Sequence, residues 1–253
     1  MDDITVIKHI NAVALFYLDF FRDAKHMEHS DNGVYRVILP KEGEQGIRFV
    51  YDIRLETLNE HETAEKIAEI RALKLPTWWG LYPLHSETRR ELIYGENFTS
   101  QPLLESGKYY MALLPGARSR IVDSEADIKQ IHKASDFALW AEIANTVFAK
   151  GYQDIHPKNH FHCYEKGRLT PYIAYVQNSP AAICAIMNNN GIASLEFAAT
   201  LPEFRRNGLA RAVCTAAIDN TFADGAEIIT LRAFHPANLL YESLGFQTFQ
   251  CNI

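Results

Sequence analysis

The sequence lacks the features that mark disulfide-rich, secreted and nucleic-acid-binding proteins. Its four cysteines lie far apart and form no Cys-x-x-Cys pair; they are Cys163, Cys184, Cys214 and Cys251. This spacing favours reduced and mostly buried thiols in a cytosolic protein. The 25 basic and 31 acidic residues give a net charge of -6. Nucleic-acid binding usually needs a basic surface, so the charge argues against that class of partner.

The sequence also lacks a long hydrophobic run. The N-terminus, Met-Asp-Asp-Ile, has no basic start of the kind found in signal peptides. The apolar segment 10–21 is interrupted by Asn11 and Asp19 and is too short to span a bilayer. We therefore predict a cytoplasmic protein with no membrane partner.

Hydrophobic patterning predicts an α/β (or α+β) fold in two domains. At 253 residues with 47% apolar content, the chain is long enough for two moderate cores. Turn residues and charge over 115–120 favour a boundary there, giving domains at 1–118 and 119–253. Helices are expected over 4–22, 61–73, 87–94, 135–149, 159–166, 206–222 and 236–244. Strands are expected over 33–39, 47–54, 77–82, 109–114, 127–132, 172–176, 182–187, 192–200, 227–232 and 246–251.

A glycine stands at the expected start of a helix in the segment Leu201-Pro-Glu-Phe-Arg-Arg-Asn-Gly-Leu-Ala210. Glycine in a helix costs roughly 1 kcal/mol relative to alanine, so its presence needs a reason. The first N–H groups of a helix lack internal partners, and Gly208 removes a Cβ that would hinder an approaching phosphate. Arg205 and Arg206 add positive charge. The segment predicts a phosphate site; a plain strand–turn–helix junction with solvated arginines is the alternative.

A second pattern is Asn238-Leu-Leu-Tyr-Glu-Ser-Leu-Gly-Phe246, at the end of a strand–helix unit. Asn238 and Tyr241 are three residues apart and therefore share one helical face. Gly245 suits the stop of that helix. Taken alone, Tyr241 would be interpreted as a half-buried packing residue.

Together the two segments resemble the GNAT acetyltransferase superfamily. The family signature, Gln or Arg, two variable residues, Gly, one variable residue, then Gly or Ala, is matched by Arg205, Gly208 and Ala210. The later family pattern is matched by Asn238, Tyr241, Gly245 and Phe246. The resemblance begins near residue 126 and covers roughly half of the chain. It implies a mixed, largely antiparallel twisted sheet flanked by helices.

The resemblance further implies acetyl-CoA as cosubstrate and no metal. The main chain at 198–200 would pair with the pantetheine arm, and N–H groups over 206–210 would bind the pyrophosphate. Asn238 would contact the coenzyme, and Tyr241 would protonate the departing thiolate. The implied coenzyme-binding residues are Ala198, Ala199, Thr200, Arg205, Arg206, Asn207, Gly208, Leu209, Ala210, Asn238 and Tyr241.

An amine acceptor must lose a proton, and Glu196 lies on the strand that leads into the phosphate turn. Many relatives of the family keep a glutamate base there. Counted by twos, Glu196 shares a strand face with Ala198 and Thr200. The alternative is an ordinary solvated strand carboxylate.

The segment His156-Pro-Lys-Asn-His-Phe-His-Cys163 invites a metal-site interpretation, because His156 and His160 are four residues apart. Pro157 weakens their helical placement and no matching ligand pair occurs elsewhere. We expect these histidines to lie in a surface loop, with substrate contact as the second interpretation.

The first half lacks the Arg-x-x-Gly-x-Gly/Ala turn. Its segment 75–98 nevertheless resembles the C-terminal strand–helix–Gly–Phe unit: with His85 set on His235, Gly95 falls opposite Gly245. This similarity favours a degenerate GNAT-like repeat, and an unrelated α/β cap is the alternative. Either would leave room for a homodimer contact. Trp78 and Trp79 are expected to pack in a core or between domains rather than to form a platform for a ligand.

The function predicted on this basis is transfer of an acetyl group to a primary amine of a small molecule, by direct attack in a ternary complex. The alternative is a non-catalytic acyl-CoA-binding or regulatory protein. Intact Tyr241 and Glu196 favour the enzyme. The sequence does not identify the acceptor amine.

Overall fold

A computed structural model describes residues 3–79, 92–93, 108–117, 126–148, 155–189 and 191–249. The chain divides into two compact units, 1–106 with 250–253, and 107–249. This division lies earlier than the boundary expected after residue 118. The reason is the strand β4 (Lys108–Leu113), which pairs within the sheet of the second unit.

In its described part, the first unit contains a three-stranded antiparallel sheet and the two helices α1 and α2. Its elements in chain order are α1 (Asp3–Arg22), β1 (Met27–Asp31), β2 (Arg36–Pro40), β3 (Phe49–Tyr51) and α2 (Glu60–Ala72). Helix α2 begins with a capping box in which the side chain of Asn59 accepts from the N–H of Glu62 and the Glu62 carboxylate accepts in return. Strand β1 was not predicted, because in its sequence Met-Glu-His-Ser-Asp only Met27 is buried.

Two predicted elements of this half fall mostly beyond the described part. Of the strand expected over 77–82, Thr77 forms an isolated parallel bridge with Val50. The helix expected over 87–94 lies outside the described residues apart from helical 92–93. Trp79 packs against the cores of the first unit, next to residues of α2 and β3.

The second unit is built on a seven-stranded sheet in the order β10-β4-β9-β8-β7-β6-β5. All neighbours are antiparallel except β8 and β9, so the predicted mixed and largely antiparallel sheet is confirmed. The strands besides β4 are β5 (Asp127–Gln130), β6 (Leu169–Val176), β7 (Ser179–Asn189), β8 (Ile192–Thr200), β9 (Ile228–Phe234) and β10 (Gln247–Phe249).

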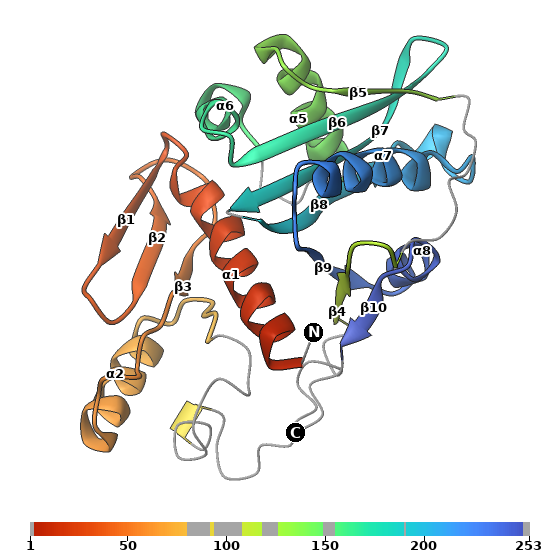
Figure 1. The fold of residues 1–253 in the computed structure, drawn as a ribbon. Coiled ribbons are helices and arrows are strands. Elements are labelled where there is room, and N and C mark those ends of the chain that lie inside the picture. The colour runs from red at the N-terminus through yellow and green to blue at the C-terminus, as the bar shows by residue number, and fades with distance from the viewer. Residues whose placement is uncertain are drawn as a thin grey trace. The chain divides into compact units, whose positions relative to one another are not determined.

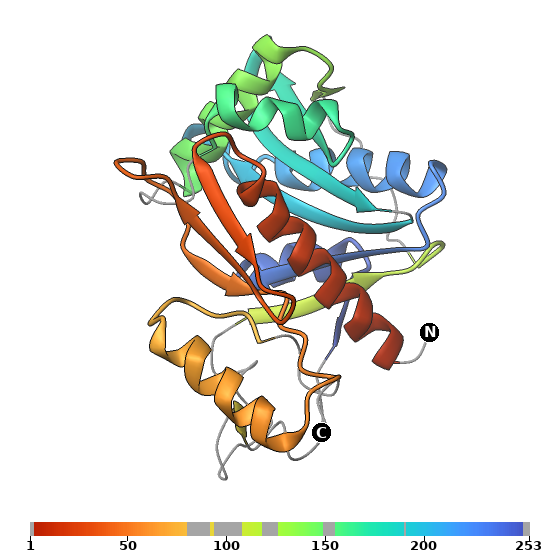
Figure 2. The same ribbon diagram turned by 90° about the vertical axis from the view of Figure 1, so that its left-hand side faces the viewer.

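Helices cover both faces of this sheet (Figures 1 and 2). They are α5 (Ala134–Phe148), α6 (Pro157–Glu165), α7 (Leu209–Ala223) and the short α8 (Ala237–Ser243). Helix α7 packs on one face of β5–β8, while α5 packs on β6, β7 and β8 from the other face. On the α5 side, the Trp140 indole N–H donates to the carbonyl of Cys184 at 3.0 Å.

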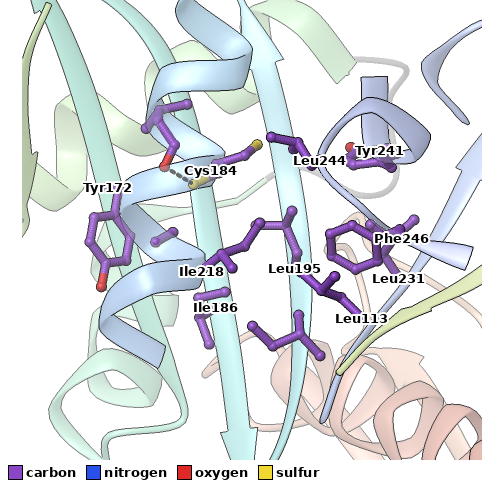
Figure 3. Packing of buried hydrophobic residues seen from close by; sticks show 14 of the residues in the cluster. Leu113, Tyr172, Cys184, Ile186, Leu195, Ile218, Leu231, Tyr241, Leu244 and Phe246 are labelled. Carbon is purple, nitrogen blue, oxygen red and sulfur yellow. Dashed lines mark hydrogen bonds between the residues drawn. The ribbon is translucent and has the colours of Figure 1, made fainter. Parts of the chain in front are cut away.

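The α7 side of the sheet holds an extensive apolar cluster, shown in Figure 3. Met111 and Leu113 of β4 belong to this cluster together with Leu195 of β8 and Tyr241 of α8. The cluster also contains Cys184, whose thiol donates to the carbonyl of Val213 at 3.5 Å (Figure 3). Strand β4 is therefore an integral part of the second core, although it precedes the expected domain boundary.

The thiols of Cys163, Cys184 and Cys214 are buried, as expected, and Cys251 lies outside the described residues. None of the described helices combines the length and the apolar character needed to cross a membrane.

The place of β4 gives a first prediction. Met111→Asp would put a carboxylate at a fully buried position between two neighbouring strands. We expect it to lower the free energy of unfolding by more than about 3 kcal/mol. Met111→Leu conserves volume and should cost less than about 1.5 kcal/mol. Urea unfolding measures both; equal stability of the two variants would contradict the assignment of β4 to this core.

Candidate functional site

The two central strands of the second sheet separate partway along their length. Strand β8 pairs with β9 only from Ile192 to Ser194, whose partners run from Ile228 to Thr230. On its other edge β8 pairs with β7 as far as Thr200. Within the described part of the chain, the β9-facing edge of β8 has no strand partner beyond Ser194. Its backbone groups there are in a position to pair with an extended ligand.

A β-bulge at Phe197 marks the start of this open stretch. Ala185 pairs with Glu196 and Ile183 with Ala199, so β8 has one extra residue over this interval. Phe197 has φ of +56°, and its ring packs edge-on against Trp140 of α5 with centroids 5.3 Å apart.

The bulge corrects the expectation that Glu196 shares a strand face with Ala198 and Thr200. Ala198 packs against the same α7-side cluster as Leu195, and Glu196 alternates with Leu195 to the opposite face. The extra residue breaks the period of two on which the expectation rested.

Strand β8 leads directly into the turn predicted to bind phosphate. A 3-10 turn over Pro202–Phe204 follows it, and α7 begins at Leu209. The Arg205 Nε donates to the Thr200 carbonyl at 3.1 Å, and the Asn207 amide donates to the Phe204 carbonyl at 3.3 Å. The Arg205 contact holds the turn against the end of the strand, and the Asn207 contact closes the turn on itself.

Gly208 is the N-cap residue of α7, with φ of +75°. A left-handed conformation at this position favours glycine. A Cβ built on Gly208 would meet no atom of the described chain within 4 Å, so backbone conformation rather than internal crowding requires the glycine. Arg206 also has a positive φ, +67°. The glycine was expected inside the first helical turn, and it lies one residue before it.

The N-terminus of α7 has the free backbone donors and the nearby positive charge that are typical of an anion-binding site. The helix has no side-chain cap, and the N–H of Ala212 donates to the carbonyl of Gly208 at 3.0 Å. The N–H groups before Ala212 belong to the orphan donors of a helix N-terminus. Arg205, Arg206 and Asn207 are exposed around them, whereas the Leu209 side chain is buried in the core and Ala210 is half-buried.

Helix α8 carries Asn238 and Tyr241, both buried. The Arg211 guanidinium joins α8 to the first turn of α7, donating to the Ser243 carbonyl at 3.1 Å and to its hydroxyl at 2.6 Å. The Asn238 amide nitrogen donates to Glu242 at 3.0 Å, and its buried Oδ1 has no hydrogen-bond partner in the described chain. A buried amide oxygen of this kind is an acceptor position for a ligand N–H.

Tyr241 is 8% exposed and lies beside Phe246, with ring centroids 5.9 Å apart (Figure 3). Burial raises the pKa of its hydroxyl well above the ordinary value, and charge on Cys214 or Glu196 would raise that pKa further. The hydroxyl therefore stays protonated at neutral pH and is available as a proton donor.

Glu196 has two polar partners on the α5 side of the sheet. The Ser194 hydroxyl donates to its Oε1 at 2.9 Å, and Arg232 Nη2 lies 3.8 Å from its Oε2. The Glu196 side chain is only 10% exposed. Burial raises the pKa of this carboxyl, while Arg232 and the Ser194 hydrogen bond lower it. It is not the solvated strand carboxylate of the alternative interpretation.

The predicted residues thus fall into three groups around the separated strands: the turn, the open edge of β8, and α8 with Tyr241. Sequence reasoning missed Ser194, Arg232 and Phe197. Arg232 lies in a strand of alternating apolar and polar residues, where an arginine is normally interpreted as solvent-facing. Its proximity to Glu196 depends on the register between β8 and β9, which the sequence pattern of either strand does not determine.

The histidine segment lies in helix α6, which begins two residues before the helix expected over 159–166, so the surface-loop interpretation of these histidines is wrong. His160 is fully buried, and its Nδ1 accepts from the backbone N–H of His156 at 3.0 Å. Within the described ranges, no three His, Cys, Asp or Glu side chains lie close enough to hold a metal ion.

Comparison with known proteins identifies the second unit. Residues 137–246 match the model of the acetyltransferase (GNAT) family, so this part of the chain is a GNAT domain. No protein among curated sequences matches the chain.

Two solved structures share the fold over almost the whole chain. A GCN5-related N-acetyltransferase from Kribbella flavida has a TM-score of 0.60 at 16% identity, covering 94% of this chain and 91% of that one. A functionally unknown conserved protein from Staphylococcus epidermidis has a TM-score of 0.52 at 13% identity, covering 92% and 93%. At these identities the likeness concerns fold alone. The degenerate repeat stays a prediction, because most of segment 75–98 lies outside the described residues.

Proposed function

We propose that this protein is an acetyl-CoA-dependent N-acetyltransferase that transfers an acetyl group to a primary amine in a ternary complex. The observation that carries the proposal is the continuity of three features in one strand: β8 parts from β9 after Ser194, bulges at Phe197, and runs into the uncapped N-terminus of α7. The GNAT family match over 137–246 supports it.

In this proposal the coenzyme lies along the open edge of β8. Its pantetheine amides pair with the main chain at 198–200, and its pyrophosphate accepts from N–H groups over 206–210. The left-handed Gly208 leaves space at that helix end. The unpartnered Asn238 Oδ1 accepts an N–H of the coenzyme.

Glu196 and Tyr241 then have complementary proton roles. Glu196 takes one proton from the substrate ammonium, and the freed amine nitrogen forms a bond to the thioester carbonyl carbon. As the tetrahedral intermediate collapses, the C–S bond breaks and the thiolate takes a proton from Tyr241. The second proton lost by the nitrogen restores Tyr241. The products are the N-acetyl amide and CoA, with one proton released from Glu196.

The alternative, a non-catalytic acyl-CoA-binding protein, would keep the turn but would not need a polar environment for Glu196. The hydrogen bond from Ser194 and the charge of Arg232 supply that environment. A panel of primary amines followed by release of free CoA tests the proposal. A rise in melting temperature with acetyl-CoA, but no CoA release from any amine, would favour the alternative.

The phosphate turn is tested with two glycines that share a backbone conformation. Gly208 and Gly167 both have positive φ and no atom of the described chain within 4 Å of an added Cβ. Each Gly→Ala change should cost about 1 kcal/mol of stability. Only Gly208→Ala should reduce the rise in melting temperature that acetyl-CoA produces. An unchanged rise in Gly208→Ala would show that the pyrophosphate binds elsewhere.

Tyr241→Phe should lower kcat on the order of a hundredfold, because the thiolate loses its proton donor. The matched control is Tyr172→Phe, in the same buried cluster, which should keep wild-type kcat. Steady-state CoA release measures both. Full turnover in Tyr241→Phe across alkaline pH would remove the tyrosine from the mechanism.

Glu196 should set the acidic limb of the pH profile. The base must be ionised, so kcat/KM should fall as the pH drops through its pKa, which burial raises above the ordinary value. Glu196→Gln should lower kcat/KM and abolish that limb. If Glu196→Gln keeps the acidic limb of the kcat/KM profile, another group is responsible for that titration.

A further inference from the structure

Glu196 and Arg232 occupy equivalent positions on the two strands that separate. The last paired residues of β8 and β9 are Ser194 and Thr230. Each charged residue lies two positions beyond its strand's last pair, so both project from the same sheet face. Arg232 and Glu196 therefore face each other where the strands begin to part.

The contact between them is loose. The nitrogen–oxygen distance is 3.8 Å, beyond the range of a hydrogen bond. Arg232 is 26% exposed and Glu196 10%, so both side chains are partly accessible to solvent. An arginine at this distance also favours the ionised form of Glu196.

We propose that the acceptor is a zwitterionic α-amino acid, whose ammonium group binds Glu196 and whose carboxylate binds Arg232. This inference rests on the proposed function and names its substrate class. In an α-amino acid the ammonium and the carboxylate are attached to one carbon. The facing carboxylate of Glu196 and guanidinium of Arg232 carry the opposite charges and could bind these two groups side by side. The guanidinium forms paired hydrogen bonds with carboxylates. The positive charge of Arg232 would repel a simple amine cation approaching Glu196, whereas the carboxylate of a zwitterion offsets this repulsion.

Aromatic side chains next to the pair indicate an apolar amino acid. Phe197 follows Glu196 and contacts the ring of Phe148, with centroids 6.5 Å apart. Phe148 is 50% exposed. On β9, Phe234 lies two residues beyond Arg232 on the same strand face and is 55% exposed. An exposed apolar side chain thus follows from each charged residue, Phe148 through Phe197 from Glu196 and Phe234 along β9 from Arg232, and exposed apolar side chains can mark a ligand site.

The test compares L-phenylalanine with L-phenylalaninamide and 2-phenylethylamine, which keep the amine and the ring but lack the carboxylate. For the full chain with acetyl-CoA, kcat/KM should be roughly ten- to a hundredfold higher for L-phenylalanine than for either of these two amines. L-Leucine, L-leucinamide and 3-methylbutylamine form a second matched series. Arg232→Gln should raise KM for the amino acids by a similar factor and remove their advantage in kcat/KM over the carboxylate-free amines of both series. Arg232→Lys should restore part of the preference.

Arg168→Gln, an exposed arginine after α6, is the control variant and should keep the wild-type preference. Binding is measured separately as the rise in melting temperature that L-phenylalanine or L-leucine adds in the presence of CoA. That rise should be absent in Arg232→Gln.

The outcomes separate this inference from the proposed function. Equal turnover of amino acids and carboxylate-free amines, with Arg232→Gln lowering both alike, would overturn the zwitterion site and leave acetyl transfer standing. Stabilisation by the amino acids without CoA release from any amine would support the site and contradict acetyl transfer. If the amino acids are neither acetylated nor raise the melting temperature, the inference is overturned, whatever acetyl-CoA alone does to the melting temperature.

Discussion

The end of the β8–β9 ladder after Ser194 is the constraint on which the site depends. A sheet normally satisfies both edges of an inner strand, and here one edge of β8 is left available in the described chain. The bulge at Phe197 follows and brings Ala198 to the α7-side core, while Glu196 faces the opposite side. The strand separation and the bulge together thus place an open backbone edge next to a partly buried carboxylate.

The surrounding elements fix the parts of the site relative to one another. Trp140 holds Phe197 from the α5 side, and Arg205 fastens the turn to the end of β8. Arg211 joins α7 to α8, so the helix that carries Tyr241 is held to the helix whose N-terminus follows the turn. Two of these contacts, Trp140 with Phe197 and Arg211 with Ser243, join residues far apart in sequence, and all three favour a site that is formed before any ligand arrives.

Much of the fold and part of the site could be predicted from the sequence, because local chemistry dictates them. Gly208 was noticeable since a helix start seldom keeps glycine without a backbone reason, and β8 was predicted with its observed bounds. The bulge was not predictable, since Phe197 has no side-chain preference for a positive φ. The Glu196–Arg232 pair depends on register between strands. The buried position of His160 depends on the packing of α6, which a polar segment does not reveal.

The position of β4 in the sheet has a consequence for the order of folding. Each residue of β4 pairs with a residue of β9 more than a hundred positions later in the chain, and β10 closes its other edge. During synthesis, β4 emerges from the ribosome long before β9 or β10 has been made, so its apolar residues remain without their strand partners during that time. Sheet closure is therefore a late, non-local step that comes after the β6–β8 meander has its own neighbours. The early-synthesised β4 therefore needs protection against premature association until β9 and β10 have been made.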